Sequence, residues 1–463
     1  MITDATPDLP VTELAERLRD RRTTSTELTE AYLARIATHS GRFNAFETVT
    51  ADLARREARA ADAAIRAGKY RGVLHGIPFG AKDLFDTAGV RTSWGAAPTR
   101  NRVPRRDATV VRKLRGAGAV LLGKLAMVEF AGGLGYRWPD ASASGPGRNP
   151  WNTDRWTGGS SSGSGAAVAA GLVGFALGTE TWGSILCPAA FCGITGLRPT
   201  YGRVSRAGAM VCSDSFDKIG PMARSAADCR VILAAIAGPD VDDSSAADEP
   251  LDFARPKPLP RGLRAAILPL DFSKVGEPEV KHAFDQAVDV VRSLGVRAEI
   301  AQLPDFPAAD VAGVIITAEA LSSFENFYRD GSVKQLTDPY APYQVEIASA
   351  MSGADLVKAW RMREVLQRRM RDFFDRYDVI LSPNFMSVAP PIDRDLYETL
   401  PYPDPVGAVG NACGLPALAM PSGLGRDRLP VSFQIMGPPW SEGLLLDLGE
   451  AYQAKTGHHL ARP

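Results

Sequence analysis

A segment rich in glycine and serine, residues 158–184, is the part of the chain best suited to covalent chemistry. It holds eight glycines and five serines. A serine hydroxyl becomes a nucleophile when a neighbouring base removes its proton. Glycine costs conformational entropy, so this composition indicates a backbone requirement. A flexible linker is not favoured because residues 166–177 are continuously apolar or small. A phosphate-binding loop is not favoured either, because no basic residue follows the segment.

Two well-known motifs fit this chain poorly. Gly159–Gly163 reads as the G-x-S-x-G turn that presents Ser161 as a nucleophile, but that turn follows a buried strand. Residues 148–156 are instead polar and aromatic, and the whole chain has only five histidines to supply the base. Gly118–Lys124 has the spacing of an ATP-binding loop, but Leu125 replaces the hydroxyl residue that binds magnesium.

The composition is typical of a soluble globular protein without a charged partner. The 53 basic residues balance 53 acidic residues, so we expect no nucleic acid and no membrane as partners. The first residues lack the basic start and apolar stretch of a signal peptide, and the apolar run 166–178 is too short to span a bilayer. Five cysteines without C-x-x-C spacing suit reduced thiols. We therefore expect a cytoplasmic protein without a metal or an organic cofactor.

Apolar periodicity predicts helices and strands in alternation. Thr24 and Glu27 form a capping box before a helix over 25–38, and a second helix covers 49–67. From Gly76 onward, short apolar runs at 120–122, 172–177 and 379–381 alternate with helical stretches at 107–117, 164–171, 225–237, 278–294, 354–376 and 443–455. This alternation favours an α/β fold with helices on both faces of the sheet, an α/β/α arrangement.

One stretch, residues 238–262, is acidic and then rich in proline, which indicates a surface connection. We interpret it as a division within one domain. The predicted organisation is a single domain over 1–463, with N-terminal helices at 10–68, a catalytic core at 70–237, the linker at 238–262 and a second subregion at 263–463.

Several of these segments together resemble the amidase signature family. Gly158–Gly171 followed by Gly178–Ile185 is similar to the core block of that family, and Gly76–Asp83 is similar to its lysine segment. Later landmarks of the family match Pro188–Val204, Tyr377–Pro383, Asn411–Pro416 and Leu429–Pro439. The resemblance implies the amidase signature fold, built on a mixed, twisted central sheet, and an enzyme that hydrolyses linear amides.

The resemblance implies three catalytic roles. Ser184 aligns with the nucleophile, Ser160 with the serine that relays the proton, and Lys82 with the base. It further implies a cis peptide bond between Gly159 and Ser160. A lysine takes up a proton only when it is neutral, and the apolar neighbours at residues 77–81 favour the neutral amine.

The resemblance also implies residues that assist the triad. The oxyanion hole would consist of the backbone N–H groups of Thr181, Trp182, Gly183 and Ser184. Gly159 and Ser161 would support the site. Two roles stay open for Ser161, which either joins the hydrogen-bond network of the triad or caps the following helix.

Three positions depart from the usual family pattern Gly-Thr-Asp-Thr-Gly-Gly-Ser-Ile-Arg: Glu180 replaces Asp, Trp182 replaces Gly and Leu186 replaces Arg. Loss of the Arg predicts that a supporting ion pair near the nucleophile is absent or rebuilt. The indole of Trp182 either narrows the acyl side of the pocket or packs into the core. We expect a hydrophobic substrate pocket that contains Met127, Phe130, Tyr136, Trp138, Trp182 and Phe385.

The sequence therefore predicts a hydrolase that cleaves the C–N bond of a small hydrophobic or aryl amide or carbamate, of the urethanase or aryl-acylamidase type, through an acyl-enzyme on Ser184. One alternative is the glutamine-hydrolysing component of a tRNA-dependent amidotransferase, which works with partner chains. The missing Arg at position 186 and the aromatic residues speak against it. The other alternative is a noncatalytic scaffold relative, which the intact Lys-Ser-Ser set disfavours. A homodimer is an expectation at the level of the family only.

Overall fold

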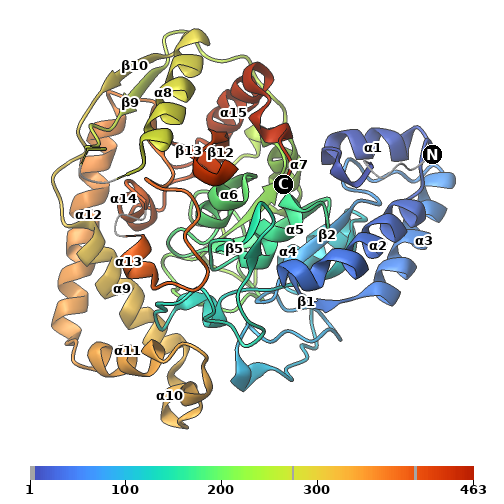
Figure 1. Cartoon of the computed structure of the whole chain (residues 1–463), viewed down its shortest axis with the longest axis horizontal. Coiled ribbons are helices and arrows are strands. Elements are labelled where there is room, and N and C mark those ends of the chain that lie inside the picture. The colour runs from blue at the N-terminus through green and yellow to red at the C-terminus, as the bar shows by residue number, and fades with distance from the viewer. Residues whose placement is uncertain (1–5, 274–275, 401–403) are drawn as a thin grey trace.

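The computed structural model describes residues 6–273, 276–400 and 404–463, and one mixed sheet runs through it (Figure 1). Pairs β2–β3, β2–β6, β9–β10 and β9–β11 are parallel, and the remaining pairs of neighbours are antiparallel. The predicted α/β fold with a mixed central sheet is confirmed. The strands follow the order β1 (Phe46–Val49), β3 (Val120–Leu125), β2 (Pro78–Lys82), β6 (Phe175–Glu180), β8 (Lys218–Ala223), β7 (Thr195–Arg198), β12 (Ala417–Leu424), β13 (Pro430–Met436), β11 (Val379–Pro383), β9 (Arg264–Ile267) and β10 (Arg297–Ile300).

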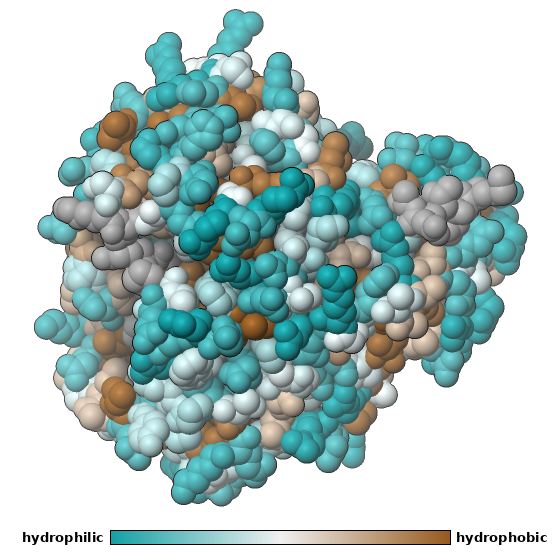
Figure 2. All heavy atoms as spheres, in the orientation of Figure 1, coloured by the Kyte–Doolittle hydropathy of each residue, from teal (hydrophilic) through white to brown (hydrophobic). Residues whose placement is uncertain are grey.

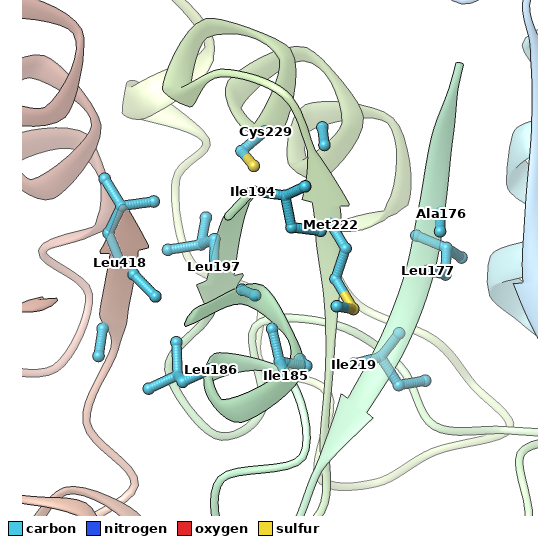
Figure 3. Packing of buried hydrophobic residues seen from close by; sticks show 14 of the residues in the cluster. Ala176, Leu177, Ile185, Leu186, Ile194, Leu197, Ile219, Met222, Cys229 and Leu418 are labelled. Atoms are coloured by element: carbon cyan, nitrogen blue, oxygen red, sulfur yellow. The ribbon is translucent and has the colours of Figure 1, made fainter. Parts of the chain in front are cut away.

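Helices cover both faces of this sheet. A Cβ at Gly196 of β7 would meet α6 (Leu186–Cys192), so that side of the strand faces α6. The next residue, Leu197, points to the opposite face. Its partner on β12, Leu418, lies against Gly449 of α15 (Glu442–Thr456). Figure 3 shows the same layering, with Cys229 of α7 (Ala226–Ile236) across the strands from α6.

The N-terminal helices lie together at one end of the molecule (Figure 1). They are α1 (Val11–Arg19), α2 (Ser25–Phe43) and α3 (Ala51–Arg66). The predicted capping box is present, because Thr24 Oγ1 accepts the Glu27 N–H at 3.1 Å and Glu27 Oε2 accepts the Thr24 N–H at 2.9 Å. Helix α2 runs past the predicted end at residue 38 and stops at Asn44, whose backbone is left-handed.

Most of the other predicted helices form within a few residues of the expected bounds. They are α4 (Thr109–Gly116), α5 (Ser162–Ala169), α7, α8 (Pro278–Ser293), α12 (Gly353–Phe374) and α15. Helices that the sequence patterns did not predict are α6, α9 (Ala308–Ser323), α10 (Glu325–Arg329), α11 (Tyr340–Ser349), α13 (Leu396–Thr399) and α14 (Gly407–Ala412). Alanine-rich α9 lacks a clear apolar stripe, which explains why periodicity did not reveal it.

Residues 148–156 were predicted to lack a strand, and this is wrong. They form β4 (Arg148–Asn149) and β5 (Asn152–Trp156), a small antiparallel pair separate from the main sheet. These strands are only partly buried, so polar residues are tolerated in them. The segment is therefore a surface hairpin and not the buried strand that a G-x-S-x-G turn requires.

The main sheet has two halves that follow the order of the chain. Strands β1, β3, β2, β6, β8 and β7 precede residue 238, and the strands from β12 to β10 follow residue 262. Between α7 and β9 the only regular element in the described chain is the short 3-10 helix η4 (Asp252–Ala254). The division into subregions at 238–262 stays a prediction.

The surface is mostly polar on the face shown in Figure 2, with hydrophobic side chains scattered between hydrophilic ones. In the described part of the chain, no helix combines the length and the apolar character needed to cross a membrane.

Candidate active site

Lys82 ends strand β2, and its side chain is fully buried. Its Nζ lies 2.7 Å from Ser160 Oγ and 2.9 Å from Thr179 Oγ1. Thr179 belongs to β6, the parallel neighbour of β2, so the sheet itself sets this contact. Among the residues that the structure describes, no carboxylate forms an ion pair with Lys82. The amine therefore has hydroxyl groups as its partners.

The environment of Lys82 makes the neutral amine accessible. Burial lowers the pKa of Lys82 from 10.5 to about 7, although the charges of Asp217, Cys212 and Glu180 oppose this shift. A large fraction of the amine is then uncharged near neutral pH. A neutral amine 2.7 Å from a serine hydroxyl is able to accept its proton.

Ser160 and Ser161 lie between β5 and α5. The peptide bond between Gly159 and Ser160 is cis, as the resemblance implies. Ser161 precedes α5, but its side chain does not cap that helix. Its Oγ instead donates to the Thr179 carbonyl at 3.3 Å, and its N–H donates to the Ser184 carbonyl at 3.3 Å. Of the two roles left open for Ser161, the helix cap is wrong, and its contacts join Ser184 to β6.

Ser184 follows Gly183, which lies in the left-handed region at φ 84°, a conformation that glycine adopts without strain. Ser184 is 7 % exposed. Its hydroxyl makes no hydrogen bond with any described residue. Catalytic hydrogen bonds are often absent or long before substrate binds. The structure thus joins Lys82 to Ser160 through their side chains and joins Ser184 to Ser161 through the backbone.

An ion pair beside the nucleophile is present although position 186 is not Arg. Arg198 Nη1 donates to Glu180 Oε1 at 2.8 Å, and both side chains are fully buried. Leu186 packs in the hydrophobic core. Of the two outcomes expected from the loss of the Arg, the structure shows the rebuilt pair, with the guanidinium supplied by β7.

A cavity of about 380 Å³ opens beside these serines. Gly159 and Gly183, the residues that precede Ser160 and Ser184, both line it. Three of the predicted pocket residues, Tyr136, Trp182 and Phe385, line it as well. Trp182 is partly buried against the hydrophobic core and also forms a wall of the cavity, so the two roles expected for it occur together.

The other predicted pocket residues, Met127, Phe130 and Trp138, do not line this cavity, and that expectation needs correction. Phe130 stacks on Phe324 and Phe327, with ring centroids 4.7 and 4.8 Å away. Met127 is fully buried in the core. Trp138 is 36 % exposed at the surface.

Sequence reasoning also missed several lining residues. Some follow known motifs closely, and Cys187 lies three residues after Ser184. Others come from α13 and from the chain just after it, a region without any motif. The missed residues are Gly132, Gly135, Trp156, Cys187, Leu396, Tyr397, Leu400 and Asp404.

Asp404 is the acidic residue of the cavity lining. Its Oδ1 accepts hydrogen bonds from Gln434 Nε2 at 2.8 Å and from the Val406 N–H at 3.1 Å. Its Oδ2 is shielded from solvent and has no hydrogen-bond partner among the described residues. Burial raises the pKa of Asp404 to about 6, against the effect of these hydrogen bonds and of Arg198. The cavity thus presents an unsatisfied carboxylate oxygen to a ligand.

A metal centre has no obvious place here. In the described ranges, no three His, Cys, Asp or Glu side chains gather closely enough to hold a metal ion.

Comparisons with known proteins point in one direction. A family model described as Amidase matches residues 27–446. A chain of the glutamyl-tRNA(Gln) amidotransferase from Roseiflexus sp. (strain RS-1) is 40% identical over 485 residues, which cover 98% of each chain. The structure of native peptide amidase from Stenotrophomonas maltophilia superimposes with a TM-score of 0.87 at 32% identity, covering 100% of this chain and 99% of that one. A bacterial aryl acylamidase shares the fold, with a TM-score of 0.86 at 22% identity over 98% of this chain and 99% of that chain.

Proposed function

This chain belongs to the amidase signature family, and we propose that it is a stand-alone amidohydrolase for small hydrophobic or aryl amides and carbamates. The observation that carries the proposal is the 2.7 Å contact between Lys82 Nζ and Ser160 Oγ, in a site where the pKa of Lys82 is about 7. A lysine with these properties is a base suited to activating serine at neutral pH.

The proposed reaction begins with two coupled proton transfers. Lys82 takes the proton of Ser160 while Ser160 takes that of Ser184, and Ser184 Oγ forms a bond to the carbonyl carbon. The charge that develops on the carbonyl oxygen meets the backbone N–H groups of residues 181–184. The proton then returns through Ser160 to the leaving nitrogen, and the C–N bond breaks. Water cleaves the resulting ester of Ser184 by the same proton path.

The character of the cavity supports the substrate class. Its lining is dominated by the rings of Tyr136, Trp156, Trp182 and Phe385 and by Leu396 and Leu400. A cavity of about 380 Å³ suits a small ligand with an aryl group. Carbamates are included because their carbonyl carbon also carries a nitrogen leaving group and is open to the same attack.

Asp404 favours a second candidate function, the hydrolysis of glutamine. Its free Oδ2 would accept a hydrogen bond from an ammonium group, and the relative from Roseiflexus is named as part of an amidotransferase. However, none of the described residues that line the cavity is cationic, so the α-carboxylate of glutamine lacks a partner there. This lining favours a stand-alone hydrolase.

A substrate panel separates the two candidates. The purified chain, without any partner, is assayed with p-nitroanilides, aryl carbamates, aliphatic amides, esters and glutamine. We expect release of nitroaniline and of the carbamate amine, slower ester cleavage and no ammonia from glutamine. Glutamine turnover without turnover of anilides would support the amidotransferase candidate instead.

Covalent labelling tests the nucleophile and the scaffold alternative. A fluorophosphonate probe is expected to label the wild type and the Ser164→Ala control, because buried Ser164 only donates to the Leu177 carbonyl. Ser184→Ala is expected to abolish labelling. Labelling that persists in Ser184→Ala would refute the nucleophile assignment, and a wild type that is neither labelled nor active would support a noncatalytic relative.

A further inference from the structure

Glu180 lies at the end of β6 and makes hydrogen bonds on the far side of the nucleophile. Its Oε2 accepts the N–H groups of Ile185 and Leu186 at 2.9 and 3.0 Å. These two residues directly follow Ser184 and begin α6, where the first N–H groups have no partner inside the helix. Figure 3 shows the side chains of Ile185 and Leu186 within the hydrophobic cluster. One carboxylate oxygen therefore holds the backbone that emerges from Ser184.

Arg198 fixes the direction of this carboxylate. Its Nη1 donates to Glu180 Oε1 at 2.8 Å, and its Nε donates to the Leu415 carbonyl at 2.9 Å. Burial alone would raise the pKa of Glu180, but Arg198 and Lys218 outweigh it, and this pKa lies below its usual value. The carboxylate thus stays ionised and keeps both oxygens as acceptors.

The other end of the same loop is anchored at Thr181. Its Oγ1 donates to Asp217 Oδ1 at 2.5 Å, and its carbonyl accepts a hydrogen bond from Lys218 Nζ at 3.5 Å. Asp217 is itself held by the N–H of Cys212 at 2.7 Å. Between the two anchors lie Trp182 and Gly183, which face the cavity. The loop is thus fastened on both sides of the residues that meet the substrate.

Another buried pair with the same chemistry lies outside this cluster. Arg203 Nη2 lies 3.1 Å from Glu442 Oε2, with the two side chains 2 % and 0 % exposed. Glu442 Oε1 accepts the Thr200 N–H at 2.8 Å. This pair also combines a buried ion pair with a backbone N–H, but its carboxylate does not contact the loop of Ser184. It provides a matched comparison for Glu180.

We propose that Glu180, oriented by Arg198, is a positioning residue that sets the place of Ser184 and of the neighbouring N–H groups during attack on the substrate. The inference rests on the proposed role of Ser184 as nucleophile. A carboxylate that holds two successive N–H groups determines where the preceding residue lies, and misplacing a nucleophile by about 1 Å costs about 100-fold in rate.

The test compares Glu180→Gln, Glu180→Asp and the control Glu442→Gln. With the best substrate of the panel, we expect kcat of Glu180→Gln to fall about 100-fold and KM to change less than about threefold. The rate of fluorophosphonate labelling should fall with kcat. Glu180→Asp keeps the charge but does not reach both N–H groups, and its kcat should fall about tenfold. Glu442→Gln should lower thermal stability and leave kcat unchanged.

The pH profile separates a positioning role with its charge from a general loss of structure. Asp217, Cys212 and Glu180 are the charged and titratable groups that raise the pKa of Lys82. Removal of the Glu180 charge lowers that pKa, so the acid limb of kcat/KM should move to lower pH in Glu180→Gln and stay in place in Glu180→Asp. A purely structural defect would leave the limb where it is in both variants.

Folding is the remaining concern, because Glu180→Gln leaves Arg198 buried without a counter-ion. The double variant Glu180→Gln with Arg198→Met removes both charges and is expected to fold with the same loss of kcat. Wild-type kcat and labelling in any folded Glu180 variant would overturn the inference. If the wild type itself is labelled independently of Ser184, the proposed function fails, and this outcome is distinct.

Discussion

Buried ionisable groups occur in two different settings in this molecule. Lys124 on β3 and Asp83 just after β2 face each other, with Nζ 3.6 Å from Oδ1. Lys124 Nζ also donates to the Phe85 carbonyl at 2.6 Å and to Thr92 Oγ1 at 2.7 Å. Lys82 on the neighbouring strand has only hydroxyl partners, and Asp404 has one oxygen without any partner among the described residues.

This contrast shows that burial does not make a lysine a base by itself. Burial lowers the pKa of both lysines, to about 8 for Lys124 and about 7 for Lys82. Lys124 satisfies its hydrogens within the fold, and a carboxylate stands beside it. Lys82 instead lies against a hydroxyl next to an open cavity. Paired charges hold the fold, and unpaired ones at a cavity are available for chemistry.

The largest effect is expected from exchange of the two lysines for arginine. Lys82→Arg should lower kcat/KM at least about 1,000-fold, as much as Lys82→Ala, because a guanidinium is not deprotonated near neutral pH. Lys124→Arg keeps its charge and should retain activity within about tenfold. Steady-state kinetics on the best substrate measure both. Substantial activity in Lys82→Arg would count against a lysine base.

The next effect concerns pH. Since only neutral Lys82 accepts a proton, kcat/KM should rise with pH, level off above about pH 7 and fall about tenfold for each unit below. A profile measured from pH 5 to 9 checks this. Lys124→Met should show the same limb as the wild type. A limb that moves in that variant would mean that the two lysines are not independent.

Asp404 sharpens the comparison from the side of the carboxylates. Asp404→Asn removes a negative charge that faces the cavity, so KM for substrates with an amino group should rise about tenfold. KM for neutral anilides should stay the same or fall. Paired KM measurements on an anilide with and without an amino group provide the test. Equal changes for both substrates would remove Asp404 from substrate recognition.

The smallest effect on catalysis is expected at the structural pair. Lys124→Met leaves Asp83 buried without its cation and should lower the free energy of unfolding by about 3 kcal/mol. The kcat of the folded protein should stay close to that of the wild type. Urea denaturation and kinetics below the transition measure the two quantities separately. A large loss of kcat with unchanged stability would contradict the structural role.

The residues of the triad could be named from sequence because each lies in a motif with fixed spacing. Lys82 ends a buried strand, and the positions of Ser160 and Ser184 follow from the glycine pattern around them. The α/β class followed from alternating apolar runs and helical stretches. Helix α9 escaped notice because its apolar residues do not gather on one side.

The walls of the cavity could not be predicted in the same way. Phe130 and Tyr136 occupy one irregular segment, yet only Tyr136 reaches the cavity. Phe130 and Ala131 have left-handed backbones, with φ of 48° and 56°, so no regular period sets the direction of their side chains. Asp404 and Arg198 reach the site from distant parts of the chain, and one sequence alone does not reveal such contacts.

The antiparallel contact between β7 and β12 joins the two halves of the sheet, and residues 238–262 cross from one half to the other only once. A break of the chain within that stretch would yield two fragments, each with an exposed edge strand that the other fragment completes. Because Arg198 ends β7 and its Leu415 partner lies just before β12, such fragments would recover activity only on reassociation. The fold is therefore a natural starting point for a split enzyme whose signal reports the meeting of two fused proteins.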